Sequence, residues 1–418
     1  VHVVGAGLAG LSAALCLAER GVAVSLHEAA GHAGGRCRSF HDTTLDRVID
    51  NGNHLVLTGN DAVARYLTRA GAAAGLRAAE EAAFPMADLA AGARFTLRLN
   101  RGPVPWWVLM PGRRVPGTAV ADYLGGWRLA AAGPGATVAE AVRDRGPLWR
   151  AFWEPLTLAV LNTTPERGQA RLLWRVLQRT FLRGAGPSRP MFAPEGLGEA
   201  LVAPVLARLK TRGVETSFHD ALKGLTVRDG RAAALSLASG PVTLGAEDRV
   251  ILALPPSRLA PLLEPHFGKM QMPQDDGAIL NAHFVVRDPA CLAHCAPLTG
   301  GLGSLAHWVF VRGDVVSVTV SAADALGIMA TPRQELAARL WSEVQGILSL
   351  GDACYSAARI LVEKRATFDQ SPEGVAKRLK PTTSLTNVFL AGDATDTGLP
   401  ATIEGAVLSG ETAARHAA

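Results

Sequence analysis

The sequence predicts an α/β fold, in which a discontinuous Rossmann-type dinucleotide-binding domain carries an inserted α+β substrate domain. The chain begins with VHVVGAGLAG, where a short apolar strand runs into a GxGxxG turn and then into a helix. Two further apolar runs, VILALPP and NVFLAGD, lie far along the chain and have the character of other parts of the same domain. The segments between these three blocks differ from them in composition, which predicts two insertions.

The 418 residues therefore divide into five segments. We expect the nucleotide-binding domain to comprise residues 1–78, 191–256 and 381–418. We expect the substrate domain to comprise residues 79–190, which are rich in Trp, Pro and Arg and mostly helical, and residues 257–380, which mix strands with a helix. A chain of this length can form two or three domains with large cores.

The first segment has the strand, turn, helix and strand order that gives a GxGxxG motif its meaning. Apolar residues recur from Leu8 to Ala18 at the spacing of one helix face, and Gly21 ends that helix. A second strand then alternates up to Glu28, whose carboxylate can accept both ribose hydroxyls of an adenosine. The residues expected to bind the dinucleotide here are Gly5, Gly7, Leu8, Ala9, Gly10 and Glu28.

Two further motifs favour FAD over NAD as the cofactor. A GGR loop follows the first segment's acidic residue, and its guanidinium can reach a pyrophosphate. A GD pair follows the C-terminal strand, where a carboxylate can bind ribitol hydroxyls, and the next helix would direct its positive end at a flavin. The flavin-binding residues expected from these motifs are Gly34, Gly35, Arg36, Gly392, Asp393, Ala401 and Thr402. The predicted domain is therefore a Rossmann-type FAD-binding domain.

The remaining elements follow from periodicity and turn residues. Apolar residues from Leu197 to Leu209 predict one helix, and the DG and SG pairs at 229–230 and 239–240 predict hairpin turns. The alternation of VVSVTVS at 315–321 predicts a strand, and residues 332–348 predict a helix.

Composition excludes several classes of function. Hydrophobic residues make up 48% of the chain, yet no apolar run reaches the length of about eighteen residues that a membrane-spanning helix needs. The basic residues behind the net charge of +5 are scattered, so we expect no nucleic-acid partner. Five cysteines form an odd set without a disulfide framework, which predicts a reducing cytoplasm. We expect no metal site.

The order of GxGxxG, strand-ending Glu28, GGR and C-terminal AGD resembles that of the flavin-containing amine oxidase and phytoene desaturase superfamily. The closer resemblance is to the squalene-associated FAD-dependent desaturases, the hydroxysqualene dehydroxylases of bacterial hopanoid synthesis. The segments that carry it are GGRCRSF, IDNGNHLVLTGN, PWWVLMPGRRVPG, LNTTPERGQARLL, SRPMFAPEGLGEALVAP and LAGDATDTGLPATIEGAVLSG. One departure is Ala394, which stands where relatives often carry an aromatic residue.

This resemblance implies bound FAD and the reduction of a C30 allylic alcohol, hydroxysqualene, to squalene. No second complete GxGxxG follows a strand, so we expect an external electron donor. Two alternatives stay open. A carotenoid-type desaturase would share every cofactor motif, but its flavin would remove hydride from a polyene substrate. A prenyl-binding protein on the same fold would not use flavin, against which the intact glycine motifs argue.

The resemblance also implies that the IDNGNHL segment passes near the flavin ring. His54 is the nearby side chain whose ordinary pKa suits proton donation, and Asn51 is the second catalytic candidate, although both could serve only the local backbone. A cationic transition state would need a dry pocket with aromatic faces. The aromatic candidates for that pocket are Trp149, Phe152, Trp153 and Trp174, of which we expect no more than two to line it.

The apolar segment PVPWWVLMPGRR, residues 103–114, permits two interpretations. It could be a buried loop. It could also dip into the inner face of the cytoplasmic membrane through Trp106, Trp107 and Leu109, with Arg113 and Arg114 at the lipid headgroups. We favour the second, in which residues 104–110 form the entrance for an isoprenoid lipid.

Overall fold

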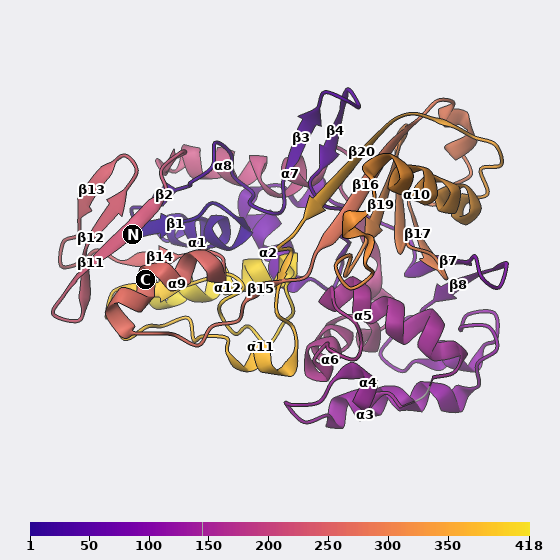
Figure 1. Ribbon diagram of the computed structural model, residues 1–418. Coiled ribbons are helices and arrows are strands. Elements are labelled where there is room, and N and C mark those ends of the chain that lie inside the picture. The colour runs from indigo at the N-terminus through magenta and orange to yellow at the C-terminus, as the bar shows by residue number, and fades with distance from the viewer. Residues whose placement is uncertain (144) are drawn as a thin grey trace.

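A five-stranded parallel sheet forms one end of the molecule in the computed structural model, which describes residues 1–143 and 145–418. Its strand order is β10-β2-β1-β14-β22, and both chain ends lie beside it (Figure 1). The strands are β10 (Glu215–Ser217), β2 (Ser25–His27), β1 (His2–Val4), β14 (Val250–Leu252) and β22 (Val388–Leu390). His2 pairs with both Ser25 and Val250, and Val250 pairs with Val388. One sheet therefore joins three segments that are far apart in the sequence.

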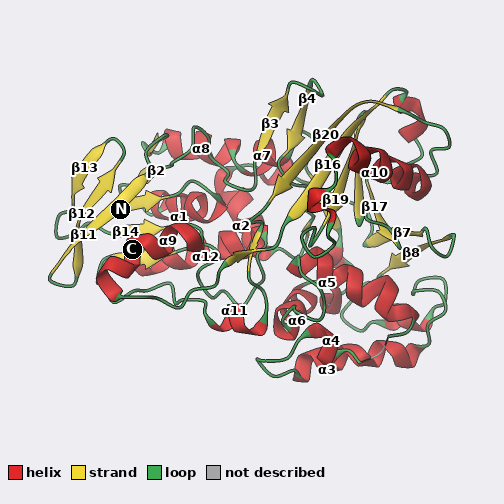
Figure 2. Ribbon diagram, in the orientation of Figure 1, coloured by secondary structure: helices red, strands yellow, loops and turns green. Residues whose placement is uncertain are grey.

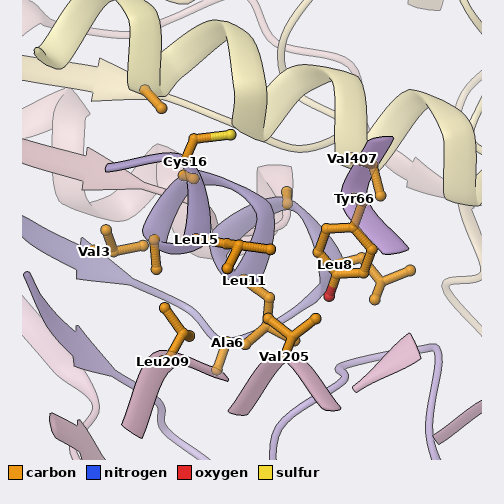
Figure 3. Packing of buried hydrophobic residues seen from close by; sticks show 14 of the residues in the cluster. Val3, Ala6, Leu8, Leu11, Leu15, Cys16, Tyr66, Val205, Leu209 and Val407 are labelled. Atoms are coloured by element: carbon orange, nitrogen blue, oxygen red, sulfur yellow. The ribbon is translucent and has the colours of Figure 1, made fainter. Parts of the chain in front are cut away.

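Helix α1 (Leu8–Glu19) is apolar around nearly its whole circumference because helices cover it as well as the sheet. Its side chains pack between those of α12 (Ile403–Ala417) and α8 (Ala203–Thr211), as Figure 3 shows. Contact with α12 is closest at Gly410, where a Cβ atom would come within 2.1 Å of the Ala9 carbonyl oxygen. Helix α2 (Asp61–Ala70) completes this core.

The single helix expected from Leu197 to Leu209 is wrong, because the structure divides it into α7 (Leu197–Leu201) and α8. Pro204 lies at the start of α8 and has no N–H to donate. Its ring would also clash with the carbonyl of the residue four positions earlier in a continuous helix. The proline therefore sets the break.

The expected hairpins form a three-stranded antiparallel sheet at the outer edge of this domain. Its strands are β11 (Leu222–Arg228), β12 (Arg231–Leu237) and β13 (Gly240–Thr243). Asp229 and Gly230 both take positive φ values, 49° and 70°, as a tight two-residue hairpin turn requires. Helix α9 (Pro256–Phe267) packs on this sheet.

A seven-stranded sheet forms the other half of the molecule, in the order β20-β16-β19-β18-β17-β7-β8. Its strands are β20 (Tyr355–Glu363), β16 (Ile279–Val286), β19 (Val315–Val320), β18 (Trp308–Arg312), β17 (Leu298–Leu302), β7 (Ala83–Asp88) and β8 (Ala93–Arg98). Helix α10 (Arg333–Leu348) packs against it, and the expected strand at 315–321 and helix at 332–348 are both confirmed.

Short helices gather below this sheet, as Figure 2 shows. They are α3 (Gly126–Ala131), α4 (Val138–Ala141), α5 (Glu154–Leu161) and α6 (Ala170–Arg179). Small sheets connect the two halves: β3 (Ser39–Asp42) with β4 (Arg47–Asp50), β5 (Val56–Leu57) and β6 (Arg77–Ala78) with β9 (Pro190–Phe192), and β15 (Asp275–Asp276) with β21 (Thr367–Phe368). Helix α11 (Pro372–Ala376) follows β21.

The seven-stranded sheet contains a buried histidine that makes the fold sensitive to acid. His283 is 1% exposed, and burial lowers its pKa from 6.5 to about 4. Because the unfolded chain binds this proton more tightly, stability is full above pH 6.5 and falls as the pH drops towards 4. His283 alone should contribute a loss of about 2 kcal/mol by pH 5 in urea unfolding, and His307, whose pKa burial also lowers to about 4, adds to it. His283→Gln should reduce this loss, whereas the same change at the exposed His41 should not; equal loss in all three proteins would contradict the assignment.

Candidate functional site

The glycine-rich turn connects β1 to α1 and holds Glu28 beside it. Gly5 has a φ of 99°, which favours glycine, and its N–H donates to the His27 carbonyl at 2.7 Å. The Glu28 carboxylate accepts hydrogen bonds from the N–H groups of Ala6, at 2.7 Å, and Ala30, at 2.8 Å. Each carboxylate oxygen can accept a further bond. Glu28, the residue expected to bind ribose, is therefore fixed at the edge of the turn and can still accept hydrogen bonds from a ligand.

The two glycine motifs meet at Gly7. Gly7 pairs with Gly34 in an isolated parallel bridge, and a Cβ atom on Gly35 would lie 3.4 Å from the Gly7 Cα. A Cβ atom on Gly7 itself would meet nothing within 4 Å, whereas one on Gly10 would come within 1.8 Å of the Gly5 carbonyl oxygen. Gly10 thus serves the packing of the chain, and the open space over Gly7, at the start of α1, fits a pyrophosphate.

The GGR and GD motifs also meet, although 357 positions separate the two residues concerned. The Arg36 guanidinium donates to the Asp393 carboxylate at 2.5 Å and to the Ala366 carbonyl at 2.7 Å. Asp393 raises the pKa of Arg36 by Coulomb attraction. The pair brings a cation and an anion together next to the glycine turns. The sequence predicts that Arg36 binds the pyrophosphate and Asp393 the ribitol, but it does not predict that the two side chains contact each other.

The loop that follows Asp393 is held by a buried arginine. Arg378 donates to the carbonyls of Asp393, at 3.3 Å, and Leu399, at 2.8 Å, and its guanidinium lies 4.5 Å from the centre of the Phe368 ring. The loop ends at Thr402, whose hydroxyl accepts the Gly405 N–H at 3.1 Å and caps α12. Its course brings the positive end of α12 to the site.

Ala394, the position that departs from the family pattern, is fully buried. It packs with Leu385, Leu390 and Leu252 in the core between β14, β22 and the three-stranded sheet. A larger side chain here would have to displace these neighbours, because Ala394 has no exposed surface.

A cavity lies between the seven-stranded sheet and helices α5 and α6. The space among its lining atoms is about 1730 Å³, part of which opens to solvent. Its apolar walls include Phe84, Met86, Phe95, Leu97, Phe152 and Phe181. Its polar lining includes Asn53, His54, Asn162, Thr319, Ser321 and Thr367. Ala401 and Thr402 also line it, so the cavity reaches the residues expected to bind the flavin.

Several of the wall aromatics form one cluster. The rings of Phe84 and Phe181 lie 5.6 Å apart at an angle of 20°, and Phe152 meets Phe181 edge to face at 5.9 Å. Trp308 and Phe310 from β18 also line the cavity. The cavity therefore offers π faces on more than one side.

Of the four aromatic residues expected to line a pocket, Phe152 lies on this cavity. Trp149, Trp153 and Trp174 do not line it; the expectation was that no more than two of the four would. They pack in the core of the helices below the sheet, where Trp149 is 8% and Trp153 4% exposed. Sequence reasoning missed Phe84, Phe95 and Phe181, although the alternation of ARFTLR at 93–98 marks Phe95 and Leu97 as one face of a strand.

His54 lines the polar part of the cavity. Its ring lies over Gly52, where a Cβ atom would come within 3.3 Å of His54 Nε2. Burial lowers the pKa of His54 below its ordinary value, and the opposing effect of Asp50 is smaller. The neutral imidazole therefore predominates near pH 7, and the protonated ring is a stronger acid than an ordinary histidine.

A buried asparagine missed in the sequence positions this segment. Asn281 on β16 accepts hydrogen bonds through Oδ1 from the N–H of Asn53, at 3.3 Å, and from Asn53 Nδ2, at 3.2 Å. Its Nδ2 donates to the Asn51 carbonyl at 3.4 Å. Asn51 joins this network through its backbone carbonyl, and Asn51 does not line the cavity.

The segment at 104–110 is only partly exposed. Trp107 is 6% exposed and packs in the core that backs the cavity wall, with its ring 5.3 Å from that of Tyr123. The expectation that Trp107 faces lipid is therefore wrong. Trp106 is 43% and Leu109 62% exposed, and Trp127 on α3 is 66% exposed. Within residues 1–143 and 145–418, no helix combines the length and apolarity needed to cross a bilayer.

Comparisons with known proteins agree with this architecture. The model of the flavin-containing amine oxidoreductase family matches residues 8–418. The hydroxysqualene dehydroxylase of Rhodopseudomonas palustris is 42% identical over 99% of this chain and 97% of its own, and that of Zymomonas mobilis is 39% identical over the same shares. Among solved structures, cyclohexylamine oxidase from Brevibacterium oxydans superimposes with a TM-score of 0.73 at 12% identity over 100% of this chain and 98% of that chain.

The family explains the convergence of the glycine turns, the acidic strand end and the Arg36–Asp393 pair, because its members carry a flavin. Similarity to the two dehydroxylases extends over nearly the full length of each chain. The protein therefore belongs to the flavin-containing amine oxidoreductases, and within them to the family of the hydroxysqualene dehydroxylases.

Proposed function

We propose that the protein is an FAD-dependent hydroxysqualene dehydroxylase, which reduces the allylic alcohol to squalene in hopanoid synthesis. The observation that carries this proposal is full-length similarity, at 42% identity, to a protein of that name. The cavity supports it, since apolar and aromatic side chains make up much of its wall and suit a C30 isoprenoid chain.

The residues around Gly7 fit FAD. Glu28 would bind the adenosine ribose, the start of α1 the pyrophosphate, and Asp393 the ribitol. Bound FAD in its reduced form would supply a hydride. No second dinucleotide motif follows a strand in the sequence, so we expect the electrons to come from an external donor.

The chain's own residues would prepare the C–O bond for cleavage. His54 would donate a proton to the hydroxyl oxygen, which leaves as water, while the flavin-derived hydride forms the new C–H bond. The balance is alcohol plus one proton plus one hydride, giving hydrocarbon plus water. Positive charge that develops on the allylic carbons would be stabilised by the π faces of Phe84, Phe152 and Phe181. The apolar walls would keep bulk water from capturing that cation.

Anaerobic incubation with hydroxysqualene and dithionite tests this function. Gas chromatography with mass spectrometry should show squalene, formed in proportion to the flavin present. Absence of squalene, with flavin fully bound and reduced, would overturn the proposal. Formation of a more unsaturated product from squalene under oxidising conditions would instead assign a desaturase.

We further propose that the exposed apolar patch of Trp106, Leu109 and Trp127 contacts the membrane from which substrate is drawn. The 3₁₀ helix at Trp106–Leu109 contacts the one at Val120–Gly125, which leads directly into α3, so these exposed residues come from neighbouring elements. Arg113 lies 5.3 Å from the centre of the Trp106 ring, where it could reach anionic headgroups. The buried Trp107 links this surface to the aromatic core behind the cavity.

A double variant, Trp106→Ser with Leu109→Ser, should float with anionic liposomes less than the wild type. Loss of about 2 kcal/mol of apolar burial corresponds to a partition coefficient lowered roughly 30-fold. The control is Leu326→Ser on the loop after β19, since that leucine is 41% exposed outside the patch. Equal flotation of all three proteins, each with full flavin content, would contradict membrane contact through this patch.

A further inference from the structure

Glu404 places a buried carboxylate in the first turn of α12 and on the wall of the cavity. Its side chain is 4% exposed. Among the described residues that line the cavity, Glu404 is the only carboxylate and Arg179 is the only arginine or lysine. The two residues form an ion pair, in which Arg179 Nη1 donates to Glu404 Oε1 at 3.0 Å.

The carboxylate also ends a second helix, α2. Oε1 accepts the N–H of Ala62 and Oε2 that of Val63, each at 3.1 Å, and both groups belong to the first turn of α2. Asn60 precedes α2 but does not cap it, because its Oδ1 accepts the Leu57 N–H at 2.7 Å. Burial raises the pKa of Glu404, and its two N–H donors and Arg179 oppose that change by favouring the ionised form.

The two charges of this pair are screened unequally. The side chain of Arg179 is 39% exposed, so water reduces the effect of its positive charge. The carboxylate has almost no contact with solvent, and its field passes through protein and cavity, where screening is weaker. The pair therefore leaves a net negative potential on the cavity side.

This potential acts beside the expected position of the flavin. Ala401 and Thr402, two of the residues expected to bind flavin, line the same cavity and directly precede α12. The positive end of α12 would stabilise negative charge on the reduced ring, and a carboxylate in the first turn opposes that effect. Reduction by two electrons and one proton adds one negative charge to the ring, so the charge of Glu404 disfavours it.

We propose that the carboxylate of Glu404 lowers the reduction potential of the bound flavin, with Arg179 as a partial counter-charge. The inference rests on the flavin position given in the proposed function, at the start of α12, but not on the substrate. A lower potential makes the reduced flavin a stronger hydride donor, which suits a reaction that delivers hydride to carbon.

Four variants separate the charge of Glu404 from its structural role. Glu404→Gln keeps the size of the side chain and removes the charge, whereas Glu404→Asp keeps the charge and shortens the side chain that caps α2. Glu411→Gln is the matched control, because Glu411 is also 4% exposed, pairs with Arg65 and Arg69, and lies about 10 Å further along α12. Arg179→Gln removes the counter-charge, while both N–H donors still favour the ionised carboxylate.

Each holoprotein is reduced with dithionite at pH 8 without oxygen, in equilibrium with a reference dye, and the midpoint potential is read from the two absorption spectra. We expect Glu404→Gln to raise the potential by about 30 mV, a tenfold change in the equilibrium constant for two-electron reduction. Glu404→Asp and Glu411→Gln should stay near the wild-type value, and Arg179→Gln should shift it downward.

An unchanged potential in Glu404→Gln would overturn the inference. An equal rise in Glu404→Asp or Glu411→Gln would also overturn it, because altered packing and not the charge would then be the cause. If Glu404→Gln does not retain flavin, Arg179→Gln decides, and a potential that is unchanged or raised there would overturn the inference. The measurement needs bound flavin but no substrate, so it stands even if wild-type protein forms no squalene, the result that would overturn the proposed function.

Discussion

Gly7→Ala should strongly weaken flavin binding without disturbing the fold. The φ of Gly7 is −71° and its ψ 176°, which any residue adopts, and the added methyl group would meet no protein atom within 4 Å. It would instead occupy the space where a pyrophosphate must approach the backbone at the start of α1. We expect FAD affinity to fall on the order of 100-fold or more, about 2.7 kcal/mol. The ratio of flavin absorbance to protein absorbance measures this directly.

The matched control is Gly10→Ala three positions later. There the methyl group would collide with the Gly5 carbonyl oxygen inside the turn, at 1.8 Å, so the expected defect is in the protein itself. Circular dichroism and soluble yield should report that loss for Gly10→Ala and remain normal for Gly7→Ala. Purification of Gly7→Ala with a full complement of flavin would show that the cofactor does not lie over this glycine.

His54→Gln should lower kcat for hydroxysqualene by roughly 100- to 10,000-fold, the usual contribution of a positioned general acid. Glutamine can still donate a hydrogen bond but cannot deliver a proton. Since the acid must be protonated and burial lowers the pKa of His54, the wild-type rate should rise as the pH falls below 6.5. Acid unfolding through His283 should then limit the rate from the other side.

His294→Gln serves as the control, because that imidazole is exposed and bonds the Leu348 carbonyl, away from the cavity. Its rate and pH profile should match those of the wild type. A His54→Gln enzyme that keeps its rate and loses no pH dependence would leave His54 as a hydrogen-bonding residue only.

The glycine turns and Glu28 could be predicted because their function depends on residues close in the sequence. The first ten residues contain a strand, a tight turn and the beginning of a helix. Each of these has its own pattern of glycines and apolar spacing. The pairing of Arg36 with Asp393 could not be predicted, because it needs the two ends of the chain to meet. Neither residue carries a local sign of its partner.

The cavity was predicted less well for the same reason. Phe84 lies on β7 and Phe181 on a 3₁₀ helix at Phe181–Arg183, and only the tertiary fold brings these distant segments together. Trp153 is an aromatic residue of the kind that lines apolar pockets, yet its side chain packs in the core of the helices below the sheet. Asn162 on the cavity wall accepts the Ala322 N–H at 2.7 Å, a contact that no periodicity encodes.

The order of strands in the parallel sheet also constrains how the protein forms. Neighbouring strands β1, β14 and β22 start at residues 2, 250 and 388, so the sheet has to close loops of more than a hundred residues. Such non-local pairing makes folding slow, and a chain still on the ribosome exposes one edge of β14 until β22 has emerged. Since Asp393 and α12 follow β22, the flavin site is complete only after this late segment has joined the sheet, and a chain cut before β22 would leave an open strand edge prone to aggregation.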